Sequence, residues 1–117
     1  MLFNANQKIL FIGDSITDFN RKRPVGEGLF EGIGRSYVAL VDALLRTGYP
    51  ELKPRLVNMG NSGDRVRELK KRWQTDVLDL KPDWVSVLIG VNDVWRQFDS
   101  PLMTEEHVYL PEFEAAY

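Results

Sequence analysis

The stretch KILFIGDSITD, residues 8–18, decides the fold. Its apolar half runs from Lys8 to Ile12 and stops at Gly13, a pattern typical of a short strand that is buried on both faces. Two later segments repeat the pattern, RLVN at residues 55–58 and WVSVLI at residues 84–89. The sequence therefore predicts three short buried strands.

Amphipathic helices are predicted between these strands. Apolar residues follow helical spacing after Ser36 and again after Asp64, and Gly48 and Pro82 supply the stops. The apolar positions are Tyr37, Leu40, Val41, Leu44 and Leu45 in the first helix, and Val66, Leu69, Trp73, Val77 and Leu80 in the second. This alternation predicts an α/β fold: a parallel sheet in strand order 2-1-3, with right-handed crossovers and helices on both faces. Residues 14–35 are expected to form a long loop or broken helix, and a last helix is expected to start at Pro111.

Length and composition exclude several classes of protein. The 117 residues fit one domain, and 44% hydrophobic and 27% charged residues are ordinary for a globular protein. A net charge of −2 argues against nucleic-acid binding, and the lack of cysteine excludes disulfides and thiolate metal sites. No apolar run is long enough for a membrane span, and the first residues do not resemble a signal peptide. We therefore expect a soluble, cytoplasmic protein.

Polar clusters follow all three predicted strands. They are GDSITD at residues 13–18, NSGD at 61–64 and GVND at 90–93. Ligands of open parallel sheets bind beyond the carboxyl ends of the strands, so these clusters are expected to form one site. Taken singly, each cluster is more often a helix cap or a turn.

The residue types in these clusters suit acyl transfer. Ser15 is placed at a strand-to-helix turn, where a hydroxyl is exposed and can act as a nucleophile. The backbone N–H groups of Ser15 and Gly63 and the side-chain amide of Asn92 are the kinds of donor that stabilise an oxyanion. A glycine at position 63 also lets a substrate oxygen approach the backbone closely.

FIGDSITD, NSGD and GVND, in that order and spacing, resemble the first three blocks of the SGNH (GDSL-type) serine hydrolases. The flanking segments RKRPVGEG, RVRELKKRW and PDWVSVLIGVNDVWRQFDSP look closest to the bacterial acetylxylan esterase branch of that family. The resemblance implies a flavodoxin-like three-layer α/β/α sandwich. It implies Ser15 as nucleophile, Gly63 and Asn92 as oxyanion donors, and Asp14 as the residue that shapes the turn. The implied reaction is ester hydrolysis without a cofactor or metal, with an acetylated carbohydrate such as xylan as substrate.

The sequence departs from the family pattern at the catalytic base. The family takes its Asp and His from a D-x-x-H motif that this sequence does not contain, and the single histidine, His107, lies in another context. We expect His107 to be structural, for example as a cap of the final helix. We therefore expect residues 1–117 to be the N-terminal part of a single hydrolase domain, truncated after its third strand and inactive or nearly so alone. The open sheet edge predicts a homo-oligomer or a domain-swapped assembly.

Other interpretations stay open at this point. Asp14, Asp18, Asp64 and Asp93 lie near strand ends and could serve an Mg²⁺-dependent phosphohydrolase, and a truncated relative could be a non-catalytic binding or assembly module. Candidate substrate contacts are Arg21, Trp95 and Arg96, whereas Trp84 is expected in the core. The basic residues Arg65, Arg67, Lys70, Lys71 and Arg72 are expected on the solvated face of their helix.

Overall fold

The computed structural model describes residues 2–29 and 31–117, and it is built around one four-stranded sheet. The strands are β1 (Lys8–Gly13), β2 (Gly26–Glu27), β3 (Arg55–Asn58) and β4 (Trp84–Leu88), in the order β2-β3-β1-β4. β1 pairs in parallel with β3 on one side and β4 on the other. The predicted order of the three main strands, with the first in the centre, is therefore confirmed.

β2 is a strand that the sequence did not predict. It has two residues and pairs antiparallel with β3, so that Gly26 lies opposite Asn58 and Glu27 opposite Val57. The sheet is therefore mixed rather than purely parallel. A two-residue strand inside the irregular segment 14–35 leaves no periodic pattern, because its pairing is decided by distant residues.

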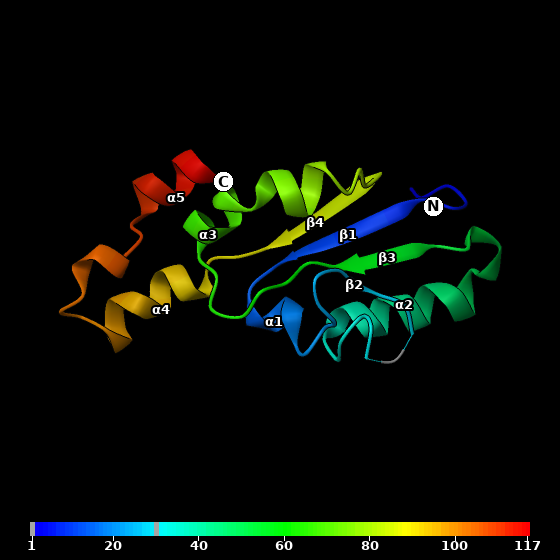
Figure 1. Cartoon of the computed structure of the whole chain (residues 1–117), viewed down its shortest axis with the longest axis horizontal. Coiled ribbons are helices and arrows are strands. Elements are labelled where there is room, and N and C mark those ends of the chain that lie inside the picture. The colour runs from blue at the N-terminus through cyan, green and yellow to red at the C-terminus, as the bar shows by residue number, and fades with distance from the viewer. Residues whose placement is uncertain (1, 30) are drawn as a thin grey trace.

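Helices cover both faces of the sheet, as Figure 1 shows, with α2 (Tyr37–Gly48) on one side and α3 (Val66–Lys71) on the other. Alternate residues of β1 supply the two cores. Ile9 and Phe11 pack toward α2, and Leu10 and Ile12 pack toward α3. The predicted three-layer α/β/α arrangement is confirmed.

α2 begins where Ser36 accepts a hydrogen bond from the Val38 N–H at 3.2 Å, an N-cap that satisfies one free donor of the first turn. Val38 is fully buried, and Val41 and Leu45 pack beside it. Leu40 and Leu44 follow the helical spacing of the apolar positions in the sequence, but they do not lie on the buried face of α2. Both point to solvent, with 67% and 69% of their surface exposed.

The helix predicted after Asp64 is interrupted. α3 ends at Lys71, and Gln74–Leu78 form a π-helical turn, named η2. Leu69 and Val77 are still buried in one cluster, with Trp73 and Leu80 packed against it, so the predicted apolar stripe is confirmed. The wider turn lets the stripe stay on the sheet across the break, and breaks of this kind are common near functional sites.

The second half of the chain leaves β4 as an exposed edge. Among residues 2–29 and 31–117, only β1 pairs with β4, and Trp84, Val85 and Leu88 are 38%, 40% and 43% exposed. The prediction that Trp84 belongs to the core is therefore wrong. Its ring instead lies edge-on to Phe3, and its indole N–H donates to the side chain of Gln7. The shorter elements of the chain are α1 (Ser15–Asp18), η1 (Pro50–Leu52), α4 (Val91–Asp99), η3 (Thr104–Glu106) and α5 (Leu110–Ala116).

Candidate active site

Ser15 is the first residue of α1, directly beyond the carboxyl end of β1 (Figure 1). Asp14 adopts an extended conformation before it, and its Oδ1 atom accepts a hydrogen bond from the Ile16 N–H at 3.0 Å. This cap turns the chain abruptly from strand to helix. Ser15 is half-buried, and no hydrogen bond to another described residue uses its backbone N–H. Both its hydroxyl and this N–H are therefore available to a ligand.

Asp14 lies beneath this turn rather than in the opening. It is only 1% exposed. Burial raises the pKa of its carboxyl above the usual 3.8, and the negative charge of Asp64 adds to the increase, while the Ile16 N–H opposes it. These contacts fit the turn-shaping role that the family resemblance implied.

The segment 61–64 brings a second donor to the same edge. Gly63 has φ +86°, a conformation that favours glycine, and a Cβ atom at this position would meet nothing within 4 Å. The Asn61 N–H donates to Gly13 O at 2.9 Å, and the Ser62 N–H donates to Asp18 Oδ2 at 3.0 Å. These two bonds hold the Gly63 turn against β1 and α1.

Asn92 brings the third donor, from the first turn of α4. Its Nδ2 atom donates to Asp64 O at 2.9 Å, which ties the third polar cluster to the second. A side-chain amide has two N–H donors, so one remains for a ligand. Asp93 adds a further tie, because its Oδ1 atom accepts from the Val66 N–H at 3.0 Å and caps α3. Burial raises the pKa of Asp93, and the bond from Val66 opposes the increase.

Two cavities border Ser15. The smaller, about 200 Å³, is lined by Ser15, Asp18, Phe19, Asn20 and Ser62. The larger, about 400 Å³, is lined by Ser15, Ile16, Phe19, Arg35, Ser36 and Tyr37. Phe19 borders both, with 59% of its surface exposed and φ +32°, which is unusual for a bulky residue.

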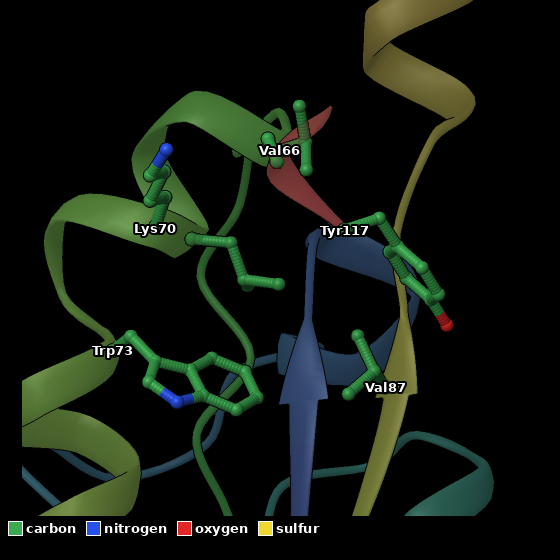
Figure 2. A pocket seen from close by; sticks show the side chains of 7 residues that line it. Val66, Lys70, Trp73, Val87 and Tyr117 are labelled. Atoms are coloured by element: carbon green, nitrogen blue, oxygen red, sulfur yellow. The ribbon is translucent and has the colours of Figure 1, made fainter. Parts of the chain in front are cut away.

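A third cavity, about 480 Å³, is apolar and contains none of the predicted site residues. Figure 2 shows Val66, Lys70 and Trp73 on one side of it, with Val87 and Tyr117 on the other. Leu69 also lines it, and Leu69, Trp73 and Val87 all belong to the core on the α3 face. This cavity is an opening into the hydrophobic core beside β4.

The three predicted substrate contacts differ in exposure, because Arg21 is buried whereas Trp95 and Arg96 are accessible. Arg21 is 7% exposed, and its guanidinium donates to the carbonyl oxygens of Gly60, Lys22 and Pro24. Burial lowers the pKa of Arg21 to about 10, and the positive charge of Arg23 adds to the effect. Arg21 therefore shapes the loop, and this geometry does not favour contact with substrate.

Trp95 and Arg96 lie on α4, one helical turn after Asn92. Trp95 is 59% exposed, and its indole N–H donates to Asp99 Oδ2 at 3.0 Å. Arg96 pairs with the same carboxylate at 3.3 Å. Both side chains are accessible, and their contact with substrate stays a prediction.

His107 is buried, and it lines neither of the two cavities that border Ser15. Its Nε2 atom lies 3.0 Å from Ser100 O, and its Nδ1 atom lies 3.1 Å from the hydroxyl of Tyr109. Both ring nitrogens of His107 are therefore engaged by other groups. Because Ser100 is the C-cap of α4, His107 closes that helix rather than capping the final one as predicted.

The four carboxylates of the magnesium alternative have other partners. Asp14 and Asp93 accept from backbone N–H groups, Asp18 pairs with Arg23 at 2.7 Å, and Asp64 pairs with Arg72 at 2.6 Å. Within residues 2–29 and 31–117, no group of three or more His, Cys, Asp or Glu side chains is placed to hold a metal ion. In the same ranges, no helix is long and apolar enough to cross a bilayer.

Asn58 is a site-supporting residue that sequence reasoning missed. It is fully buried at the end of β3, and its Nδ2 atom donates to Thr17 O at 2.7 Å and Ile33 O at 2.8 Å. Its Oδ1 atom accepts from the Gly60 N–H at 2.9 Å. The available signal was a polar residue ending the otherwise apolar segment LVN, because a buried amide requires partners.

The basic residues in and beside α3 were predicted to lie on a solvated face, and the structure bears this out for the lysines but not for the arginines. Lys70 and Lys71 are exposed as expected, but Arg65, Arg67 and Arg72 are not on a freely solvated face. Arg65 donates to Glu106 O, Arg67 donates to Glu105 O and His107 O, and Arg72 donates to Met59 O and Gly13 O. The arginine part of that prediction is wrong, because a long guanidinium side chain can reach carbonyl groups well away from its own Cα atom.

Known proteins match this chain over nearly its whole length. The GDSL-like lipase/acylhydrolase family matches residues 11–116. An acetylxylan esterase from Geobacillus stearothermophilus is 59% identical over 115 residues, which are 98% of this chain and 52% of that protein. A crystal structure of that esterase matches with a TM-score of 0.97, covering 99% of this chain and 53% of the other. An alpha/beta hydrolase enzyme from the metagenome of Lake Arreo, Spain, is 56% identical with a TM-score of 0.94, covering 97% and 53%.

The chain thus spans about half the length of the relatives it matches. Other structures of the Geobacillus esterase are catalytic mutants in which a serine, a histidine or an aspartate is replaced by alanine.

Proposed function

The chain belongs to the GDSL-like lipase/acylhydrolase family, and from that premise we propose that it supplies the nucleophile and oxyanion hole of a serine esterase. The proposed substrate is an acetylated carbohydrate such as xylan or its oligosaccharides, in line with the acetylxylan esterase relative. One observation carries the proposal. Ser15, Gly63 and Asn92 follow three neighbouring strands at one sheet edge, and the bonds through Gly13, Asp18 and Asp64 join them there.

In the proposed reaction the Ser15 hydroxyl attacks the carbonyl carbon of the acetyl ester. The backbone N–H groups of Ser15 and Gly63 and the free N–H of Asn92 donate to the negative charge that develops on the carbonyl oxygen. The sugar hydroxyl leaves with a proton, and water then hydrolyses the acetyl-serine to release acetate. Losing one oxyanion donor typically lowers turnover by about 10²–10³-fold.

This reaction needs a base to take the proton from Ser15. His107 is poorly placed for that role, because both of its ring nitrogens are engaged by Ser100 and Tyr109. We propose that a histidine oriented by an aspartate is supplied by polypeptide outside residues 1–117. The Geobacillus esterase supports this proposal, because its catalytic mutants include one of a histidine and one of an aspartate. Without a base, residues 1–117 alone are expected to be inactive or nearly so.

The test uses a fusion in which residues 1–117 replace the matching first half of the Geobacillus esterase, called the completed esterase below. It is expected to release p-nitrophenol from p-nitrophenyl acetate and acetate from acetylated xylooligosaccharides. Ser15→Ala should lower both rates on the order of 10⁴-fold or more. A folded completed esterase that hydrolyses neither ester, or whose hydrolysis survives Ser15→Ala, would contradict the proposal.

A non-catalytic binding module is the second candidate, favoured by the placement of His107. Its signature would be binding of acetylated xylooligosaccharides by residues 1–117, together with an inactive completed esterase. Isothermal titration beside the esterase assay separates the two functions.

A further inference from the structure

Arg72 occupies the junction between α3 and the π-helical turn, and its side chain is only 16% exposed. Its Nε atom donates to Asp64 Oδ2 at 2.6 Å. One terminal nitrogen donates to Met59 O at 2.7 Å and to Asp76 Oδ2 at 2.8 Å, and the other donates to Gly13 O at 3.1 Å. Four hydrogen bonds thus hold a single guanidinium inside the fold.

Two of the four partners of Arg72, Gly13 and Asp64, belong to the first and second polar clusters of the candidate site. Gly13 ends β1 and is two residues before Ser15, while Met59 directly follows β3. Asp64 follows Gly63 in the chain, and its carbonyl oxygen holds the amide of Asn92. Arg72 therefore contacts the first two clusters directly and the third through Asp64.

We propose that Arg72 is a positioning residue that sets the relative placement of Ser15, Gly63 and Asn92 and so aligns the oxyanion hole; its catalytic consequence rests on the proposed function. The planar guanidinium suits this task, because it presents five donors in a fixed fork. A lysine could keep the ion pair with Asp64 but not all four bonds, because its ammonium carries three donors on a flexible stem. Small errors in the placement of oxyanion donors are costly in turnover.

Arg67 provides a matched control in the same helix. It also joins a carboxylate, Glu112, to two backbone carbonyls, those of Glu105 and His107, at 2.7 and 3.0 Å. Glu105 and His107 lie between α4 and α5, and Glu112 lies in α5, so none of them belongs to the three polar clusters. Arg67→Lys therefore removes comparable bonds without touching the three polar clusters.

The first experiment measures the geometry in residues 1–117 directly. In ¹H–¹⁵N NMR spectra, Arg72→Lys is expected to shift the backbone amide signals of Ser15 and Gly63 and the side-chain amide signals of Asn92. Arg67→Lys is expected to leave all three in place. Unchanged signals in Arg72→Lys, or equal shifts in both variants, would overturn the proposal whether or not the chain belongs to an esterase.

The second experiment measures turnover in the completed esterase. Arg72→Lys is expected to lower kcat by about 10- to 100-fold with KM nearly unchanged, because misaligned donors weaken binding of the transition state more than that of the ester. Arg67→Lys should keep kcat near the unmutated value at the same fraction of folded protein. A loss confined to KM, or no loss at all, would overturn the catalytic role, whereas an inactive unmutated completed esterase would count against the proposed function alone.

If Arg72→Lys does not fold, Asp64→Asn tests the same proposal by removing the carboxylate partner of Arg72. The substitution removes the charge that holds Arg72 but preserves the shape and the backbone carbonyl that binds Asn92. It is expected to lower kcat with KM nearly unchanged and to shift the same three amide signals, while unchanged kcat and signals would overturn the proposal.

Discussion

Gly28 and Gly63 are two glycines with positive φ, of which only Gly63 belongs to the candidate site. Both have positive φ, +97° and +86°, and a Cβ atom at either position would meet nothing within 4 Å. Alanine in this conformation is expected to cost about 1–2 kcal/mol of unfolding free energy at each position, measurable by chemical denaturation. In the completed esterase only Gly63→Ala should also lower kcat, because its methyl group would crowd the N–H offered to the oxyanion. Equal kcat in the two variants would make Gly63 a turn residue only.

At the residue scale, the sequence predicted where the candidate site residues lie, but not the contacts that hold them there. Ser15, Gly63 and Asn92 were expected beyond the carboxyl ends of three strands, and that is where they lie. The inward reach of Arg72 could not be predicted. Helical periodicity places Cα atoms on a face, whereas the carbonyl groups that capture a guanidinium belong to distant segments such as Gly13 and Met59.

At the element scale, Asp93 couples the start of α4 to the start of α3 through Val66. Burial raises its pKa above 3.8, so the folded chain holds the Asp93 proton more tightly than the unfolded chain does. By linkage, this group makes the folded state relatively more stable as pH falls through the raised pKa, and less stable as pH rises through it.

Asp93→Asn is the test of this coupling. The difference in unfolding free energy, unmutated minus variant, should increase as pH falls from 7 to below 3.8. Urea unfolding at several pH values measures the difference. A difference independent of pH would show that folding does not shift the pKa of Asp93, and one that decreases as pH falls would show that folding lowers it; either result would contradict the prediction.

The spacing of apolar residues predicted which segments form helices and strands, but not where a helix is interrupted. The apolar stripe from Val66 to Val77 correctly indicated one buried face, but not the change to a π-helical turn at Gln74. In α2 the spacing admitted Leu40 and Leu44, which the structure places in solvent. The exposure of Leu40 and Leu44 arises because burial depends on the surface that a helix packs against, which the spacing within one helix does not encode.

At the scale of the whole molecule, the order of the three main strands was predicted correctly. Because the β4 edge is exposed, residues 1–117 are predicted to self-associate. Trp84, Val85 and Leu88 are each more than a third exposed, and the apolar cavity beside Val87 opens nearby. Unpaired apolar edges tend to pair with other chains.

Sedimentation velocity tests this association over a range of protein concentrations. Residues 1–117 are expected to form larger species as concentration rises, and Val85→Lys should shift the equilibrium toward monomer, because a charge on the edge disfavours pairing. Leu40→Lys, on the exposed face of α2, is the matched control and should leave association unchanged. A stable monomer at high concentration would contradict the prediction.

The most direct test of the central claim is to identify the atom that the acyl group reaches. The completed esterase is mixed with p-nitrophenyl acetate, quenched in acid within the first turnovers, digested and analysed by mass spectrometry. The account predicts one acetyl group on the peptide that contains Ser15, and none in Ser15→Ala. Hydrolysis without that adduct, or an acetyl group on another residue that forms at the rate of turnover, would contradict the assignment of Ser15 as nucleophile.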